Sequence, residues 1–430
     1  MDLIVVGCIA LAAMVALMAL GAPVAISMTV PALVLLFVQG GWNLMSGVVY
    51  SILWNNALNY TLVTVPMFVL MGELLAVAGI TADVYAAVRS WLWRLKGGLA
   101  FATVGACALF SAASGSSVAT VGTLGGVVSK EMSEARYDSR LASGAMVAGG
   151  GLGILIPPST AMLIYGLLTD QSIGKLFIAG LMPGIILTAL FAMTIAILVM
   201  AFPRLAPPAT RIPVASQWTL VVAVLLIGLV FVVVVGGLYL GWVGATEAAG
   251  LGAAIALVMG LSTRRLSVST VWTAVQRSVR TTGLIFGIVI GGLLLTQVLA
   301  MTRMTNVLAE LIVDMELPPI GLFAGIVLLY VMLGALVDEF AMIVLTVPIM
   351  LPIVTSAGWD PIWFGVVLVV LCQIGLILPP IGMNVFVLKG VAPYIPIKSM
   401  FTGALIFVVP MLLLLVLLYR FPQLALGLVS

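Results

Sequence analysis

The sequence is poor in charge: 7% of its 430 residues are Asp, Glu, Lys or Arg, whereas 63% are hydrophobic. A soluble domain of this composition could not keep its surface hydrated. Uncharged runs long enough to cross a bilayer, which takes about 20 residues, recur along the chain, for example at 141–169 and 212–246. The composition therefore predicts a polytopic membrane protein without a separate soluble domain.

Histidine is absent, and cysteine is scarce. Without His the chain lacks the commonest general base and metal ligand, so most catalytic designs are excluded and no enzyme is expected. The three Cys residues are widely spaced in apolar runs, which argues against a disulfide framework. The first basic residue is Arg89, so the apolar segment 3–20 lacks the basic start of a secretory signal.

Proline pairs occur twice inside apolar runs, in "GILIPPST" (153–160) and "GLILPPIG" (375–382), at an offset of 222 residues. At the same offset, "SSVATVGTL" (116–124) falls on "DEFAMIVLT" (338–346). Further weak matches follow in the same order. Together they predict that the chain is a duplication; chance recurrence of Gly, Pro and apolar residues is the alternative.

Charge gives the orientation of the two copies. Loops 89–96 and 130–140 are basic, whereas their counterparts 310–319 and 352–362 are acidic or neutral. The positive-inside rule places the first pair in the cytoplasm and the second pair on the other side. We therefore expect an inverted repeat, typical of secondary transporters, in the bacterial inner membrane with both termini periplasmic.

Each copy contains an apolar stretch that begins and ends on one side of the membrane. Residues 98–129 are too few for two crossings, which need about 40 residues. A re-entrant helical hairpin is predicted there, with "SGSS" (114–117) at its tip, and a second at 319–351 with "LVDE" (336–339) at its tip. A pair of short tilted helices is the alternative.

The expected fold is all-α, with a first repeat at 1–205, a linker at 206–216 and a second repeat at 217–430. Each repeat has five spans, one hairpin and one interfacial arm helix, the latter at 47–61 and 264–280. The spans are expected at about 2–20, 23–40, 62–88, 141–168, 177–202, 217–237, 242–262, 281–302, 361–388 and 399–419.

The proline pairs are predicted to unwind spans 141–168 and 361–388. Broken helices are tolerated in a membrane where the freed backbone lines a site. In inverted-repeat transporters such carbonyls bind cations, and half-helix N-termini face anions. Because each hairpin tip is expected opposite one break, the sequence predicts two pseudo-symmetric cation sites. Simple kinking by proline is the alternative.

The candidate residues lie at the tips and the breaks. The candidate cation ligands are Ser114, Gly115, Ser116, Ser117, Gly153, Pro157, Val337, Asp338, Gly375 and Pro379. The candidate substrate contacts are Ser159, Thr160, Pro380 and Asn384. A carboxylate near mid-membrane is costly unless a cation offsets it, which favours Asp338; a shallow, exposed acid is the alternative. For the serines, small-residue packing is the alternative. No buried Arg suggests a carboxylate clamp.

Four blocks of the sequence resemble a known family. "GWVGATEAAGLGA" (241–253) resembles the Gly-x-x-x-x-Thr-Glu-Ala signature of the large membrane subunit of tripartite ATP-independent periplasmic (TRAP) transporters. "SGSSVAT" (114–120), "GILIPPS" (153–159) and "GLILPPIGMN" (375–384) resemble other blocks of that subunit. Ala245 stands where relatives often carry Pro, which leaves only the local turn in doubt.

The resemblance implies an elevator-type fold of the ion-transporter superfamily and uptake of an organic anion coupled to Na⁺. Na⁺ would then be the coupling ion at both cation sites, with no organic cofactor. A periplasmic binding protein would deliver the anion, a carboxylate such as a dicarboxylate, a sugar acid or sialic acid. A small four-helix membrane subunit would be a separate polypeptide.

Two other functions remain open from the residues. A self-sufficient divalent-anion symporter would need no binding protein, and a channel would need no coupling ion. The sequence does not identify the anion, since in TRAP transporters the binding protein largely selects it.

Overall fold

The computed structural model describes residues 3–207, 217–304, 307, 310 and 315–429, and every regular element among them is helical. Eight helices of the described part are long and apolar enough to cross a membrane. The predicted all-α polytopic fold is confirmed. Of the predicted linker 206–216, all but the first two residues lie outside the described part, as does the middle of the acidic loop at 310–319.

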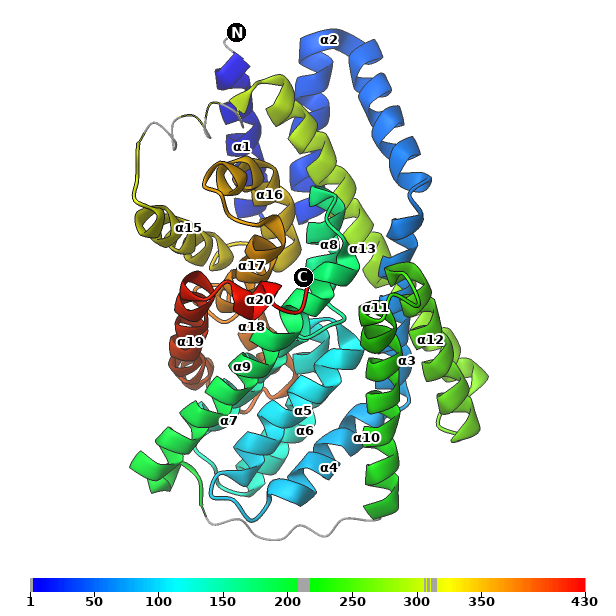
Figure 1. Ribbon diagram of the computed structural model, residues 1–430, viewed down its shortest axis with the longest axis vertical. Coiled ribbons are helices and arrows are strands. Elements are labelled where there is room, and N and C mark those ends of the chain that lie inside the picture. The colour runs from blue at the N-terminus through cyan, green and yellow to red at the C-terminus, as the bar shows by residue number, and fades with distance from the viewer. Residues whose placement is uncertain (1–2, 208–216, 305–306, 308–309, 311–314, 430) are drawn as a thin grey trace.

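The helices are arranged along one elongated body (Figure 1). Those of the first half are α1 (Leu3–Ala19), α2 (Val24–Ala57), α3 (Thr64–Val77), α4 (Ile80–Leu92), α5 (Gly98–Ser114), α6 (Ser117–Glu134), α7 (Ser139–Gly151), α8 (Thr160–Thr169) and α9 (Ile173–Ala201). Those of the second half are α10 (Gln217–Phe231), α11 (Gly237–Tyr239), α12 (Ala245–Ser262), α13 (Val268–Met301), α15 (Pro319–Gly334), α16 (Glu339–Ser356), α17 (Pro361–Gly375), α18 (Met383–Val391), α19 (Ile397–Arg420) and α20 (Gln423–Leu426).

Helix α2 is bent at a glycine pair. Gly40 and Gly41 have non-helical backbone angles, and the φ of Gly41 is +64°, a region that favours glycine. Figure 1 shows α2 rising to one end of the molecule, turning and descending. The arm helix predicted at 47–61 is the descending part; it begins directly after the bend and ends at Ala57, before a 3₁₀ turn at Tyr60–Val63.

Two predicted boundaries are wrong. The predicted single span 62–88 is two helices, α3 and α4, because Gly79 between them has a φ of +71° and ends the first. The predicted separation of 264–280 from the following span is also wrong. Helix α13 begins after Ser267, which caps it together with Thr270, and continues without a break to Met301.

Helices α2, α3, α12 and α13 pack together as one group, which we call the scaffold. Helix α13 contacts α2 closely because glycine faces it: a side chain on Gly291 would lie 2.7 Å from the Thr29 hydroxyl and 2.9 Å from the Ala25 carbonyl oxygen. Helices α3 and α12 are joined by a buried hydrogen bond of 2.8 Å between the hydroxyls of Thr64 and Thr246. Thr246 belongs to the Thr-Glu-Ala block.

A further set of helices follows the same order in both halves: two helices joined by a tight turn, a helix interrupted in the middle, and one long helix. They are α5–α9 in the first half and α15–α19 in the second, and we call them the hairpin group. The two sets meet where α7 crosses α19, since a side chain on Gly144 would lie 2.5 Å from the Gly403 carbonyl oxygen. The opposite orientation of the halves stays a prediction.

Candidate ion and substrate site

The first hairpin ends in a two-residue turn. Helix α5 ends at Ser114, and Gly115 has a φ of +61°, which favours glycine. Ser116 caps α6, and its hydroxyl accepts a hydrogen bond of 3.3 Å from the Ala119 N–H. Inside the turn, the Thr120 hydroxyl donates to the Ser116 carbonyl at 2.8 Å. The tip is therefore a compact loop of carbonyls and hydroxyls.

This tip lies directly against the first helix break, between α7 and α8. The Thr160 hydroxyl and N–H both donate to the Gly115 carbonyl, at 2.8 and 3.1 Å. Only glycine fits at two points: a side chain on Gly115 would lie 2.8 Å from the Pro158 carbonyl oxygen, and one on Gly153 would lie 2.7 Å from the Ser116 carbonyl oxygen. The structure thus brings the predicted tip and the predicted break together.

Some of the predicted ligands near the first tip are already engaged. The hydroxyls of Ser114 and Thr120 share a hydrogen bond of 2.9 Å. The Ser159 hydroxyl caps α8 by accepting from the Met162 N–H at 3.2 Å, and it donates to the Ile154 carbonyl. Pro157 is buried inside the break. These hydroxyls and the Gly115 and Ser116 carbonyls hold the tip against the break, and their role as cation ligands stays a prediction.

The second hairpin meets the second break in a corresponding way. Between α15 and α16, Asp338 caps α16: its Oδ1 accepts from the N–H groups of Phe340 and Ala341 at 3.0 and 3.1 Å. The backbones of Gly334 and Gly375 touch, because a side chain on Gly375 would lie 2.5 Å from the Gly334 Cα. The Ile381 N–H donates to the Ala335 carbonyl at 3.3 Å.

The two sites differ in exposure. Pro157 is buried, whereas Pro379 and Pro380 are exposed. Val337 and Asp338 are half-buried at the second tip. Both proline pairs contain a cis peptide bond. The second site is therefore the more open of the two in this conformation.

Asn384 makes a contact that the sequence did not predict. It follows the second proline pair, yet its wholly buried amide group donates to the Ser117 hydroxyl at 2.6 Å and to the Val147 carbonyl at 3.3 Å. Ser117 belongs to the first hairpin and Val147 to the first broken helix. Asn384 thus joins the second break to the first hairpin.

Sequence reasoning missed Gln373, which lies two residues before Gly375. It is wholly buried in α17, and neither atom of its amide group has a hydrogen-bond partner among the described residues. A side chain on Gly151, at the end of α7, would lie 2.6 Å from the Gln373 Cγ and Nε2 atoms. The signal was present: a lone polar residue in the apolar run "FGVVLVVLCQIGLIL" (364–378).

A cavity of about 410 Å³ opens between the scaffold and the first tip. Ser114, Ser116 and Thr160 line one wall. Glu73 of α3 and Arg277 of α13 lie on the opposite wall, 3.9 Å apart, and the Arg277 side chain is 61% exposed. The volume suits a small ligand, and the cavity is lined by both groups of helices and by the Arg277 guanidinium, which is paired with Glu73.

Arg277 was missed because it falls in the stretch assigned to an interfacial helix. Once α13 is continuous, Arg277 lies about two and a half turns from the start of a candidate span, where an ionisable residue indicates function. The sequence expectation concerned a buried Arg only, and Arg277 is exposed, so Arg277 is a further candidate and the earlier expectation stays a prediction.

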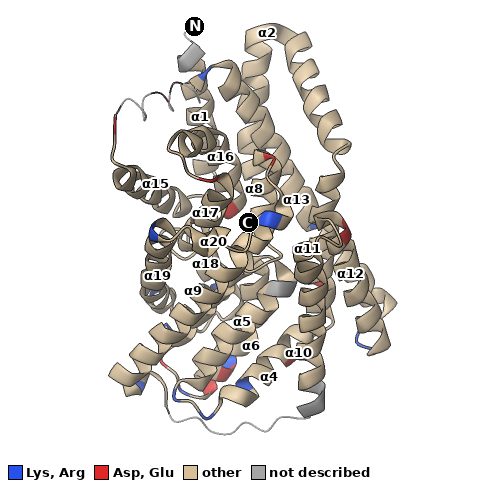
Figure 2. Cartoon of the chain, in the orientation of Figure 1, with Lys and Arg blue, Asp and Glu red and all other residues tan. Residues whose placement is uncertain are grey.

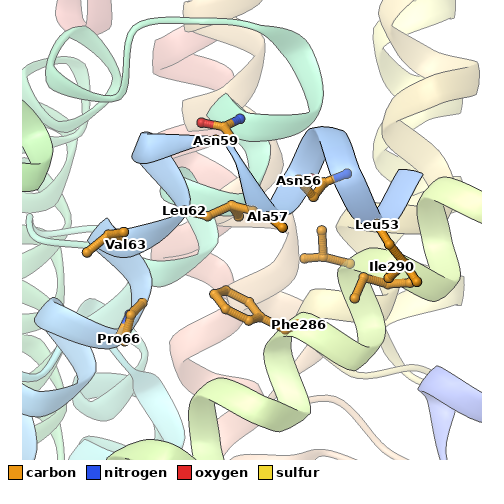
Figure 3. A pocket seen from close by; sticks show the side chains of 10 residues that line it. Leu53, Asn56, Ala57, Asn59, Leu62, Val63, Pro66, Phe286 and Ile290 are labelled. Atoms are coloured by element: carbon orange, nitrogen blue, oxygen red, sulfur yellow. The ribbon is translucent and has the colours of Figure 1, made fainter. Parts of the chain in front are cut away.

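A second cavity of about 380 Å³ lies between the descending arm of α2 and α13 and is almost wholly apolar (Figure 3). Phe286 and Ile290 face Leu53 and Leu62 across it. Its two asparagines are engaged locally; the Asn56 amide, for example, donates to the Ile52 carbonyl at 2.8 Å. This cavity offers nothing to hold an anion.

Comparison with known proteins identifies the family of the chain. The family model for the DctM component of tripartite ATP-independent periplasmic transporters matches residues 11–424 of this chain. The chain is 32% identical to the sialic acid TRAP transporter large permease protein SiaM of Vibrio cholerae, over 85% of each protein. It is 31% identical to the C4-dicarboxylate TRAP transporter large permease protein DctM of Pseudomonas aeruginosa, over 87% of this chain and 88% of the relative.

Solved structures share the fold. The YdaH transporter of Alcanivorax borkumensis superposes with a TM-score of 0.55 at 17% identity, over 83% of this chain and 85% of that one. MtrF of Neisseria gonorrhoeae superposes with a TM-score of 0.56 at 16% identity, over 84% of this chain and 80% of that one. The resemblance seen in the four sequence blocks is confirmed, and the chain belongs to the DctM family of TRAP transporter membrane components.

Proposed function

We propose that this chain is the large permease of a three-part system that takes up an organic acid with Na⁺. The relatives named above act on sialic acid and C4-dicarboxylates, both carboxylates, which supports a carboxylate substrate. The single observation that carries the proposal is the cavity between the scaffold and the first tip, which is lined by Arg277 and by Thr160, the first residue of the half-helix α8. A guanidinium and a helix N-terminus together favour an anion.

Na⁺ coupling is supported by the two contacts between hairpin tip and helix break. At each one, a hairpin tip with a polar helix cap, Ser116 in the first and Asp338 in the second, lies against an interrupted helix. Oxygen atoms of this kind are the ligands that hard cations take. In the elevator mechanism that we propose, the hairpin group carries the ions and the substrate past the scaffold.

The partners proposed are a periplasmic binding protein and a small four-helix membrane subunit. The Vibrio cholerae and Pseudomonas aeruginosa relatives are named large permease proteins, which supports a separate smaller subunit. The chain spans 67% of the length of the Haemophilus influenzae permease protein SiaT, to which it is 31% identical.

The proposal is tested by uptake into proteoliposomes that contain this chain and the small subunit, with a binding protein loaded with a radiolabelled carboxylate. We expect uptake only when an inward Na⁺ gradient and the binding protein are both present. Uptake without the binding protein would favour the self-sufficient symporter, and uptake indifferent to Na⁺ would favour a channel.

The membrane orientation can be tested by cysteine labelling. Figure 2 shows Lys and Arg gathered at the end of the molecule where α4, α5 and α6 lie, which we place in the cytoplasm. In a background in which the exposed Cys8 is replaced by Ser, cysteines at Ala135 and Ala357 should react with impermeant maleimide from opposite faces. Reaction of both from one face would rule out the inverted repeat.

Arg277→Gln should lower the apparent affinity for the substrate more than the apparent affinity for Na⁺. Hydrogen bonds to a charged group contribute about 1.5–3 kcal/mol, so the substrate concentration for half-maximal uptake should rise roughly tenfold or more. The matched control is Arg280→Gln on the same helix; Arg280 is exposed and is not among the residues that line the cavity. Equal effects of the two variants, or a normal substrate curve for Arg277→Gln, would remove Arg277 from the substrate site.

A further inference from the structure

A groove of about 520 Å³ lies between α7, α9 and α19, away from the ion and substrate site. These helices lie in the lower left of Figure 1. Its interior is apolar and is formed by Leu198, Phe202, Ile406 and Phe407. No step of the proposed transport cycle uses it.

Two arginines line this apolar groove. Arg140, whose side chain is 53% exposed, bonds Asp138 twice, from Nε to Oδ1 and from Nη2 to Oδ2, each at 3.0 Å. Arg204 follows the end of α9, is exposed, and forms no ion pair among the described residues. Two cations and one anion leave this side of the groove with a net positive charge.

The relative position of the two arginines is held by the backbone. The Asp138 N–H donates to the Leu205 carbonyl at 2.9 Å, so the start of α7 is tied to the turn that carries Arg204. The hydrogen bond from the Arg140 N–H to Asp138 Oδ1, at 2.8 Å, orders the same corner. The backbone positions of Arg140 and Arg204 are therefore fixed without a bound ligand.

The helices that form the groove also present apolar side chains outward. On α9 these are Ile197, 59% exposed, and Met200, 80% exposed; on α19 they are Leu405, 44% exposed, and Val409, 67% exposed. In a spanning helix such a surface faces lipid tails. A lipid chain can therefore reach the apolar interior from the bilayer, while the arginines lie at the basic, cytoplasmic end of the spans.

We propose that this groove binds one anionic phospholipid, with its phosphate between Arg140 and Arg204 and an acyl chain along Phe202 and Ile406. Arginine pairs with phosphate through two parallel hydrogen bonds, and basic pockets between spans on the cytoplasmic side are typical sites for anionic headgroups. A free phosphate would leave the apolar interior empty. A choline headgroup would bring a third positive charge beside the two arginines.

The test uses the full-length chain, delipidated in detergent. Native mass spectrometry and thermal unfolding are followed as dioleoyl phosphatidylglycerol, dioleoyl phosphatidylcholine or glycerol 3-phosphate is added. We expect one molecule of phosphatidylglycerol to be retained and to raise the unfolding temperature saturably, while the other two compounds have little effect.

Two kinds of variant separate the headgroup from the chain. Arg204→Gln should weaken phosphatidylglycerol binding by about fivefold, since a basic residue near a lipid surface contributes about 1 kcal/mol. Thr402→Trp should fill the groove, because Thr402 lines it. The larger side chain should be tolerated, because Thr402 is exposed and lies outside the core. Lys96→Gln, an exposed basic residue elsewhere at the same end, is the matched control.

Each outcome decides. Equal retention of phosphatidylcholine, or an equal shift with glycerol 3-phosphate, would overturn the proposal in favour of general lipid adhesion or a free-phosphate site. Phosphatidylglycerol binding that survives both Arg204→Gln and Thr402→Trp, or that falls equally with Lys96→Gln, would also overturn it. Loss in the first two variants with none in the control would support it, provided each variant unfolds normally without lipid.

Discussion

Asp338→Asn is expected to raise the Na⁺ concentration for half-maximal uptake by about tenfold or more, or to stop uptake, because cation affinity follows the charge count of the ligands. Asp338 Oδ1 caps α16 through two backbone N–H groups, and Asn caps a helix almost equally well. The substitution therefore removes the charge and leaves the tip folded. The measurement is the initial uptake rate against Na⁺ concentration at saturating substrate.

Asp360→Asn is the matched control for this prediction. Asp360 caps α17 in the same manner, with Oδ1 accepting from the N–H groups of Ile362 and Trp363 at 2.7 and 3.2 Å. It lies at the N-terminal end of that helix, at the opposite end from the break. An unchanged Na⁺ curve for Asp338→Asn, or the same change for both variants, would show that Asp338 is a helix cap and not an ion ligand.

Gly375→Ala should reduce uptake at least tenfold while the protein still inserts. The added methyl group would lie 2.5 Å from the Gly334 Cα, a backbone atom that cannot rotate away. Overpacking of this kind costs about 1–3 kcal/mol, and here it would push the second hairpin off its helix break. The measurements are the uptake rate and the unfolding temperature in detergent. We expect the uptake rate to fall far more than the unfolding temperature.

Gly325→Ala is the control. Gly325 lies in α15, the hairpin helix that also carries Gly334, and a side chain there would meet nothing within 4 Å. It should leave uptake and stability nearly unchanged. Normal uptake by Gly375→Ala would show that the close approach of tip and break is not needed for transport.

The hairpins and the broken helices could be predicted because their signals are local. Gly and Pro disfavour a continuous helix wherever they occur, so two Pro pairs at a constant offset are visible without any long-range information. The break at Gly79 was missed for the opposite reason. A lone glycine in an apolar run is compatible with a helix, and only its positive φ shows that it ends one.

The partners of the site residues could not be predicted from local patterns. Arg277 meets Glu73 because α13 packs on α3, a contact that no periodicity contains. The polar character of 264–280 suggested a helix at the membrane surface, whereas the structure continues it into a span. Asn384 was expected at the substrate, and its buried bonds to Ser117 and Val147 depend on how the two halves meet.

The Asn384 contact also bears on how the protein is made. Asn384 and Ser117 are separated by 267 residues, so the ribosome must synthesise most of the second half before the first hairpin gains this partner. Until Asn384 has been synthesised, the Ser117 hydroxyl and the Val147 carbonyl lack the hydrogen bonds that its amide donates. A chain that ends after residue 205 would never form these hydrogen bonds. We therefore expect the two halves to complete their folding together.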